Sequence, residues 1–234
     1  MAVLIGTSGY NYPEWRGSFY PPGFSATKML PYYAEGFRTV EINYTFYRMP
    51  SAKTITGWDR ETPAGFRFAL KAPKRVTHVA RLRNVDEPLR YFLDTARGLG
   101  PKLGPILFQL PPNFKKDLDR LGDLLAQLPA DLRYAFEFRH PSWFADDVYA
   151  RLGAVNAALC IADTGEGSPA LVATADFGYL RLRDEGYTAA DLEQWRDTVS
   201  RLGASWRDTF LYFKHEEAGT GPAFARQLIA LLDV

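Results

Sequence analysis

Short runs of β-branched and aromatic residues recur along the whole chain, and longer segments with a helical spacing of apolar residues separate them. Runs of this length and composition are typical of buried strands. They predict eight strands, over residues 3–8, 39–44, 66–72, 105–112, 134–140, 158–163, 178–184 and 209–215.

The segments between these runs have the periodicity of amphipathic helices, most clearly over residues 85–100, 115–129 and 188–203. In the second of them, leucines recur at intervals of three and four, opposite a charged face. These leucines are Leu118, Leu121, Leu124, Leu125 and Leu128. In the third, Thr188 is a suitable N-cap and Gly203 a suitable C-cap.

The alternation of strands and helices predicts parallel strands joined by right-handed crossovers. Eight such units in 234 residues predict a TIM-barrel-like fold, a closed (β/α)8 parallel barrel near the short end of its usual size. An open doubly wound sheet is the alternative, but no glycine-rich phosphate-binding motif follows the first strand. No linker or internal repeat divides the chain, so we expect a single domain over residues 1–234.

The overall charge excludes a general attraction for nucleic acid or anionic membranes, because the formal net charge is only +1. An anion site in this protein must therefore be a local cluster of cations. Cys160 is the only cysteine, which excludes an intramolecular disulfide and fits a reducing compartment. It lies in an apolar run, so we expect a buried, unreactive thiol.

The N-terminal residues have neither the basic region nor the apolar stretch of a signal peptide, and no apolar run is long enough to span a bilayer. We therefore expect a cytoplasmic protein that has no membrane partner. The chain has three histidines, none of which is paired at a metal-binding spacing. We expect neither a metal nor another cofactor.

Polar residues occupy the end of every predicted strand. They are Thr7 and Ser8, Glu41 and Asn43, Lys71, Gln109, Glu137 with Arg139 and His140, Asp163, Arg181 with Arg183, and Lys214 with His215. Because side chains alternate along a strand, Glu137 and Arg139 share the face opposite Phe136. In a barrel, the apolar set would pack under the helices. The polar set would face the mouth at the C-terminal ends of the strands, where enzymes of this fold place their sites.

Two interpretations of these strand-end residues remain open. Buried acids such as Glu41, Glu137 or Asp163 could form internal ion pairs with arginine or lysine. Alternatively, the strand ends could form a shared ligand site, which we favour because all eight strands contribute polar residues. For Glu137 the first interpretation implies a depressed pKa, and the second implies an acid–base role, which we favour. His78 lies after the third strand, and we expect it to be a loop residue.

Residues 7–27 form a long aromatic-rich connection, and residues 165–175 form a second, milder candidate for a functional loop. Aromatic residues at the rim of the barrel could stack against a sugar or a nucleobase. They are Tyr10, Tyr12, Trp15, Tyr44, Phe46, Tyr47 and Trp143. For each of them, packing of a loop onto the barrel is the alternative.

Several segments resemble a known family. "EINYTFYRMP", "FALKAPKRVTH", "LFQLPPNF" and "FEFRHPSW" are similar, in order, to signature segments of the YecE-like family, domain of unknown function 72. With "IGTSGYNYPEWRGSFYP", the resemblance covers essentially the whole chain. It implies a TIM-barrel-like fold and a site at the strand ends.

The surplus of cations at the strand ends favours an anionic ligand, since arginine forks suit phosphate or carboxylate. We expect an enzyme that acts on a phosphate-bearing small molecule, a sugar phosphate or a nucleotide. The catalytic candidates are Glu41, Glu137, His140 and Asp163. The candidates for ligand binding are Tyr10, Trp15, Asn43, Tyr44, Lys71, Gln109, Arg139, Trp143, Arg181, Arg183, Lys214 and His215.

Other functions stay open at this point. The same cations could bind nucleic acid in a binding or nuclease-like barrel, or the site could be a non-catalytic anion-binding module. A glycosidase with Glu41 and Glu137 as its carboxylate pair fits poorly with so many cations. Lys71 as a Schiff-base amine is a further alternative that rests on one lysine.

Overall fold

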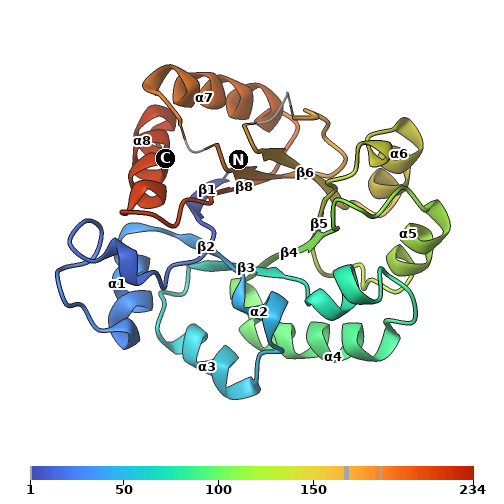
Figure 1. Cartoon of the computed structure of the whole chain (residues 1–234), viewed down its shortest axis with the longest axis horizontal. Helices are drawn as coiled ribbons and strands as arrows, with labels where there is room; N and C mark the ends of the chain where they lie inside the picture. The colour runs from blue at the N-terminus through green and yellow to red at the C-terminus, as the bar shows by residue number, and fades with distance from the viewer. Residues whose placement is uncertain (1, 166–168, 185) are drawn as a thin grey trace.

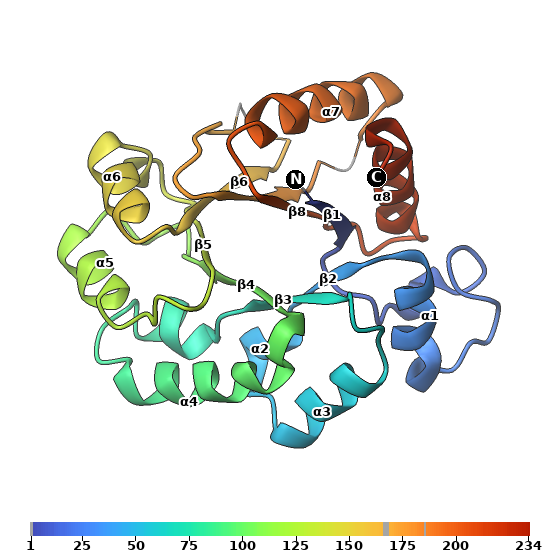
Figure 2. The same cartoon turned by 180° about the vertical axis from the view of Figure 1, so that it is seen from behind.

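Eight parallel strands form a single sheet that curves into a nearly closed barrel (Figure 1, Figure 2). The computed structural model of the chain describes residues 2–165, 169–184 and 186–234. The strands are β1 (Ala2–Thr7), β2 (Thr39–Ile42), β3 (Arg67–Lys71), β4 (Leu103–Gln109), β5 (Tyr134–Glu137), β6 (Ala158–Asp163), β7 (Phe177–Leu182) and β8 (Asp208–Phe213). The predicted fold class is confirmed.

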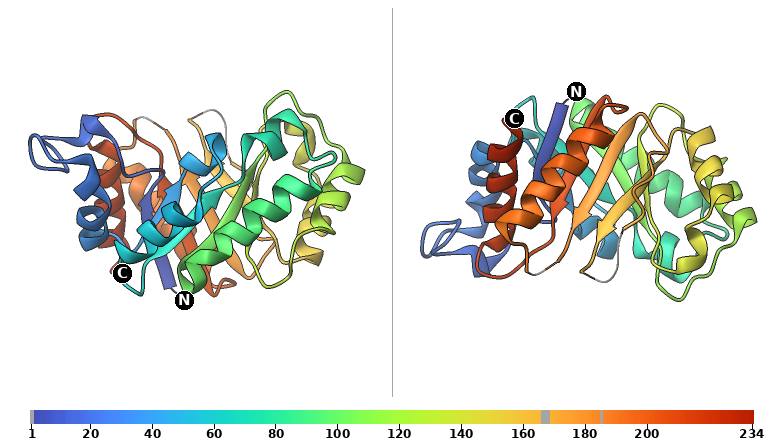
Figure 3. Two further views of the ribbon diagram at one scale, coloured as in Figure 1. Left: turned by 90° about the horizontal axis from the view of Figure 1, so that it is seen from below. Right: turned by 90° about the horizontal axis from the view of Figure 1, so that it is seen from above.

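Pairing runs in the order β1-β8-β7-β6-β5-β4-β3-β2, so that β1 and β2 are the two strands at the seam. The seam narrows at the C-terminal end, where Ser8 and Glu41 form an isolated parallel bridge. There the Gly9 N–H donates to the Glu41 carbonyl oxygen at 2.8 Å. The side views show the strands tilted to the barrel axis, with both termini near the end where the strands begin (Figure 3).

Helices surround the barrel on its outer side (Figure 1). They are α1 (Met29–Gly36), α2 (Tyr44–Tyr47), α3 (Ala52–Arg60), α4 (Asp86–Ala96), α5 (Leu118–Leu125), α6 (Asp146–Ala154), α7 (Ala189–Gly203) and α8 (Thr220–Leu232). The described residues between β6 and β7 contain no helix. Part of the second loop predicted from sequence, residues 166–168, lies outside the described residues.

The predicted ends of α7 are half right. Thr188 caps the N-terminus in a capping box with Asp191, as the sequence predicts. Gly203 is not the C-cap, because it is the last helical residue and is buried. The C-cap is Ala204, whose φ of −56° is right-handed. No glycine is needed at that position, since the backbone does not enter the left-handed region.

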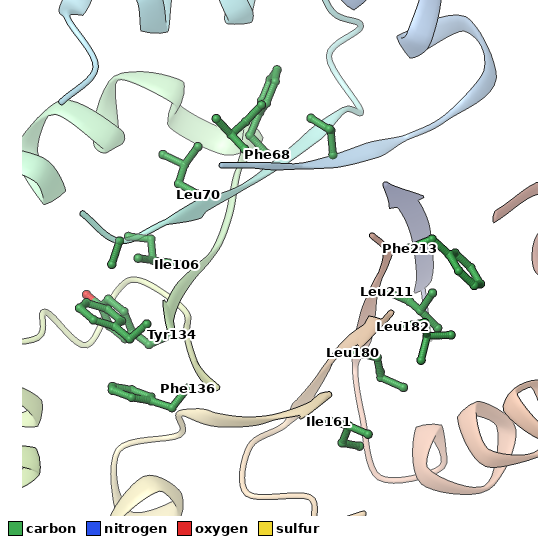
Figure 4. Close-up of a cluster of buried hydrophobic side chains, with 14 of the residues drawn as sticks. Phe68, Leu70, Ile106, Tyr134, Phe136, Ile161, Leu180, Leu182, Leu211 and Phe213 are labelled. Carbon is green, nitrogen blue, oxygen red and sulfur yellow. The ribbon is translucent and has the colours of Figure 1, made fainter. Parts of the chain in front are cut away.

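The strands divide their side chains between two packed layers. Large apolar residues such as Phe68, Phe136 and Leu180 point outward toward the helices (Figure 4). A second cluster fills the barrel interior with smaller residues and aromatic rings, among them Ala135 and Tyr179. The alternation predicted from sequence is therefore confirmed, and it places every second residue of each strand inside the barrel.

Cys160 belongs to the inner layer, where it is buried. Burial raises the pKa of its thiol well above the usual value, so the thiol stays protonated and a poor nucleophile. This agrees with the unreactive cysteine that the sequence predicts. In the part of the chain that the structure describes, no helix has the length and hydropathy to cross a membrane.

Candidate functional site

A buried ion-pair network occupies the barrel interior just below the C-terminal mouth. Arg181 of β7 donates through Nη2 to Glu41 Oε1 of β2 at 2.9 Å. The same guanidinium donates through Nη1 to Oε2 of Glu137, on β5. All three side chains are at most 1% exposed. One arginine thus joins carboxylates from strands on different sides of the barrel, and two charge-assisted contacts hold its fork in place.

Neighbouring polar groups complete the hydrogen bonding of Glu41. Ser8 Oγ donates to Oε1 at 2.5 Å, and the Tyr179 hydroxyl donates to Oε2 at 2.6 Å. Asn43 Nδ2 in turn donates to Ser8 Oγ at 2.7 Å. A buried carboxylate is tolerated when its oxygens are paired in this way.

Glu137 is held in a similar manner but closer to the mouth. Its Oε1 accepts from Gln109 Nε2 at 2.8 Å and from Arg139 Nε at 3.2 Å. Arg183 Nη1 lies 3.7 Å from the same oxygen. Burial by itself would raise the pKa of Glu137, but Arg181 and Arg139 outweigh burial and hold that pKa well below its usual range. These contacts favour the internal ion pair over an acid–base role for this residue.

Four cations lie around the mouth above this network. Arg139, Arg183 and Lys214 have side chains that are 32%, 22% and 33% exposed. Lys71, at the end of β3, is 8% exposed. These residues come from β3, β5, β7 and β8 or directly follow them, so the barrel fold brings together charges that are far apart in sequence.

The cations lower one another's pKa. Burial and the charge of Arg181 lower the pKa of Lys71 to about 8. Burial lowers the pKa of Arg183 as well, and Arg181 and Arg139 add to the effect despite an opposing contribution from Glu137. Burial and Arg183 lower the pKa of Lys214. Cations that disfavour each other's charge leave a positive potential for an anion to neutralise.

A cavity of about 810 Å³ opens at this mouth, on the side of β5, β6 and β7. Glu137, Arg139 and Arg183 supply its charged wall, and Phe138 and Phe144 supply apolar surface. The volume is within the range of small-molecule sites, which are mostly apolar with a few convergent polar groups. In the described part of the chain, no group of three or more His, Cys, Asp or Glu side chains could hold a metal ion. This observation is limited to those residues, so the lack of a metal stays a prediction.

Comparison with known proteins places this barrel in a family. The family described as "Protein of unknown function DUF72" matches residues 4–234. The chain belongs to the DUF72 family. It is 33% identical to UPF0759 protein YecE of Escherichia coli K12 over 144 residues, which cover 61% of this chain and half of that protein. It is 26% identical to UPF0759 protein YunF of Bacillus subtilis over 99% of this chain and 95% of that protein.

Solved structures agree with this family and fold. A DUF72 family protein from Thermotoga maritima is 27% identical and has a TM-score of 0.88, with both chains covered in full. A second, from Enterococcus faecalis, is 17% identical with a TM-score of 0.84, and the similarity covers 99% of this chain and 96% of that one. An L-ribulose 3-epimerase structure has a TM-score of 0.57 at 14% identity and covers 100% of this chain and 95% of its own. That likeness concerns the barrel fold alone.

Two predicted rim residues of this DUF72 chain lie elsewhere. Trp15 and Trp143 are completely buried, so neither presents a ring to a ligand. The Trp15 indole donates to the Glu216 carbonyl oxygen at 2.9 Å, and the Trp143 indole donates to that of Phe114 at 2.7 Å. For these two residues the alternative reading, packing of a loop onto the barrel, is the correct one.

Other predicted residues stand apart from the network. Asp163 accepts from the Tyr187 hydroxyl at 2.7 Å, and His140 pairs through Nδ1 with Ser142 at 2.9 Å. His215 lies 2.5 Å through Nε2 from the Asp184 carbonyl oxygen. These contacts tie the three side chains to loops at the mouth, and none of them is with Glu41, Glu137 or Arg181.

Two aromatic candidates lie on the outer part of the mouth. Tyr10 is partly buried against Tyr33, with ring centroids 6.2 Å apart. Tyr44 is 43% exposed, and its ring meets that of Trp58 at 6.4 Å. Of the two, Tyr44 has the free ring surface that stacking on a ligand requires.

The sequence interpretation missed two residues of the site. Tyr179 is two residues before Arg181 on β7, so the alternation that selected Arg181 also places Tyr179 inside the barrel. His78 belongs to a π-helical turn, Arg75–Val79, and its ring meets that of Phe46 at 4.9 Å. Burial, with Lys71 and Arg139, lowers the pKa of His78 to about 4. Nothing in the residues that flank His78 in the sequence indicates that its ring lies against Phe46.

A second cavity, of about 990 Å³, lies at the opposite end of the barrel, among the strand starts. Two of its four arginines form ion pairs: Arg97 with Asp131, and Arg133 with Asp208 at 2.6 Å. Enzymes of this fold use the C-terminal end of the strands, whereas the N-terminal end serves stability. We therefore place the candidate site at the mouth, although the cavity there is the smaller of the two.

Proposed function

We propose that this protein is an enzyme that acts on a small phosphate-bearing molecule, a sugar phosphate or a nucleotide, at the C-terminal mouth of the barrel. The observation that carries the proposal is an imbalance of charge. Among the residues that the structure describes, two carboxylates of the network, Glu41 and Glu137, are surrounded by four cations: the buried Arg181 and, nearer the mouth, Lys71, Arg139 and Arg183. Both carboxylates already bind Arg181, so the excess positive charge is left for a ligand.

The arginines divide into two roles. Arg181 is buried and donates to both carboxylates, so we assign it to holding the network together. Arg139 and Arg183 are partly exposed and line the cavity, so their forks are the groups that meet a phosphate. Lys71 adds charge from a neighbouring part of the mouth, whereas Lys214 is paired with Glu216 at 3.7 Å.

The dimensions of the mouth favour a small molecule over nucleic acid. The cavity of about 810 Å³ would enclose a sugar phosphate or a nucleotide. Nucleic acid binding relies instead on a basic surface that extends along many phosphates, and the formal net charge of this chain is only +1. We also propose a cytoplasmic location, because one cysteine fits a reducing compartment.

Ligand-induced thermal shifts test the proposal, with inorganic phosphate, a sugar phosphate and a nucleotide as probes. A ligand that binds only the folded state raises the melting temperature. We expect this rise in the wild type and its loss in the Arg139→Ala/Arg183→Ala double variant. Arg97→Ala, at the opposite end of the barrel, is the matched control and should keep the rise.

Equal shifts in the wild type and in the double variant would contradict the proposed site. Turnover of a bound sugar phosphate or nucleotide would distinguish an enzyme from an anion-binding module. Binding of an oligonucleotide that falls steeply with salt would instead support the nucleic-acid alternative.

A further inference from the structure

Lys71 is a buried lysine at the mouth, and its side chain has no hydrogen bond or ion pair with any residue that the structure describes. It is 8% exposed and ends β3. Within the described residues, the one direct interaction of its ammonium is with an aromatic face, since Nζ lies 4.2 Å from the centroid of the Phe46 ring. Its backbone is fixed, because the Thr45 hydroxyl donates to the Lys71 carbonyl oxygen at 2.6 Å. The backbone of Lys71 is thus fixed, and among the described residues no hydrogen-bond acceptor binds its amine.

A second buried lysine shows what a structural role looks like in the same chain. Lys102 is 7% exposed, and its Nζ donates to the carbonyl oxygens of Asp59 at 2.5 Å and Thr62 at 2.8 Å. It also pairs with the Asp59 carboxylate at 3.0 Å. A buried ammonium normally needs partners of this kind. The contrast identifies Lys71 as the buried lysine whose position folding alone does not explain.

The surroundings of Lys71 favour the neutral amine. Burial and Arg181 lower its pKa to about 8, although Glu41 and Glu137 oppose the shift. At pH 7.5 about a quarter of the molecules would then carry a free amine, roughly two-hundredfold more than for an ordinary exposed lysine. Desolvation and a neighbouring cation are the means by which proteins make a lysine nucleophilic.

We infer that Lys71 is the reacting amine of this site, and that it forms an imine with the aldehyde or ketone group of a phosphate-bearing substrate. The phosphate part of this inference rests on the proposed function. Arg139 follows β5, two strands away from β3 in the sheet, or about 10 Å at the usual strand spacing. A small molecule with a phosphate at one end and a carbonyl at the other can bridge that distance.

The reaction balances without an oxidant, a reductant or a metal. The nitrogen lone pair of Lys71 forms the C–N bond as the carbonyl π electrons move to oxygen. A proton passes from nitrogen to that oxygen and gives the carbinolamine. A second proton, from solvent, lets the oxygen leave as water while the nitrogen lone pair forms the C=N bond of the iminium ion.

Reductive trapping tests the inference, with pyridoxal 5′-phosphate as a probe that carries both an aldehyde and a phosphate. The full chain is incubated with limiting probe at pH 7.5, reduced with borohydride and mapped by peptide mass spectrometry. We expect Lys71 to be labelled at least about tenfold faster than the exposed lysines Lys74 and Lys115, because of its larger share of free amine. Inorganic phosphate should slow the labelling of Lys71 and leave that of the other two unchanged.

Two variants make the result specific. Lys71→Arg keeps the charge but removes the reacting amine, so it should abolish the fast labelling while a folded spectrum is retained. Lys74→Arg is the matched control and should keep the fast labelling of Lys71. Labelling of Lys71 no faster than that of Lys74 would overturn the inference.

The test of the imine at Lys71 can fail or succeed independently of the test of the proposed phosphate site. Binding of inorganic phosphate to Lys71→Arg, measured by thermal shift, depends on Arg139 and Arg183 and needs no imine. If phosphate binds but Lys71 is not labelled, the imine is wrong while the anion site stands. If Lys71 is labelled quickly by pyridoxal and by its phosphate alike, with no protection by phosphate, the imine stands and the phosphate site is wrong.

Discussion

Arg181 and Glu137 form an ion pair inside the barrel, with both side chains 1% exposed. The pair joins β7 to β5, which are not neighbours in the sheet because β6 lies between them. Glu41 binds the same guanidinium from β2. The guanidinium of Arg181 therefore links β2, β5 and β7 through the barrel interior. Removal of any one of the three side chains would leave a buried charge without one of its partners.

We predict that Glu137→Gln destabilises the fold. The amide keeps the shape of the side chain but leaves Arg181 with one carboxylate, and breaking a buried pair costs about 3 kcal/mol. Urea unfolding should therefore show a lower midpoint with an unchanged slope. The control is Asp147→Asn, which removes the exposed pair with Lys116 and should leave the midpoint nearly unchanged. A Glu137→Gln variant as stable as the wild type would indicate that the ion pair has no structural role.

The difference in stability between the wild type and Glu137→Gln should depend on pH, because the pKa of Glu137 is depressed in the folded state. In the unfolded chain a glutamate titrates near its usual pKa of about 4.3. A depressed folded-state pKa means that the carboxylate stabilises the fold above that pH, and that this stabilisation is lost as the pH falls below it. The stability gap between wild type and Glu137→Gln should thus be constant at neutral pH and shrink below about pH 4. A gap that stayed constant down to pH 3 would contradict the assignment.

The sequence was sufficient to predict the barrel and the inward face of its strands. The period of two that separates Phe136 from Glu137 is a local property, and the structure preserves it on each strand of the network. The choice of partners could not be predicted in the same way. Glu41 and Arg181 are 140 residues apart, and only the closed order of strands brings them together.

The aromatic residues show a second limit of the sequence. Trp15 and Trp143 lie in connections and were expected at an open rim, but both are completely buried. Each satisfies its indole N–H with a backbone carbonyl from a distant segment. An aromatic loop residue can equally anchor the loop or face a ligand, and the choice depends on tertiary contacts that periodicity does not report.

The hydroxyl of Tyr179 carries a third prediction. It donates to Glu41 Oε2 at 2.6 Å in the barrel interior. Tyr179→Phe removes that donor and leaves a buried carboxylate oxygen unsatisfied, at a cost of about 1–3 kcal/mol. Tyr91→Phe, at a site that is 56% exposed, is the matched control and should unfold like the wild type. Equal midpoints for the two variants would show that the hydrogen bond contributes nothing.

The last prediction concerns Lys71, whose folded-state pKa is lowered to about 8. Between that value and the ordinary lysine pKa of about 10.4, the unfolded state binds more protons, so this residue makes stability rise with pH. Below pH 8 it costs a constant free energy, at most about 3 kcal/mol. Lys71→Met keeps the packing against Phe46 without a charge, so it should be more stable than the wild type at pH 7. Its advantage should fall as the pH rises from 8 to 10.

Denaturant unfolding of both proteins at pH 7, 8, 9 and 10 measures this difference directly. Lys74→Met, which changes an exposed lysine nearby, supplies the control and should follow the wild type at every pH. An advantage that did not depend on pH would show that packing, not charge, separates the two proteins. A variant less stable than the wild type at pH 7 would show that the ammonium of Lys71 stabilises the fold, which excludes the unpaired amine on which its reactivity depends.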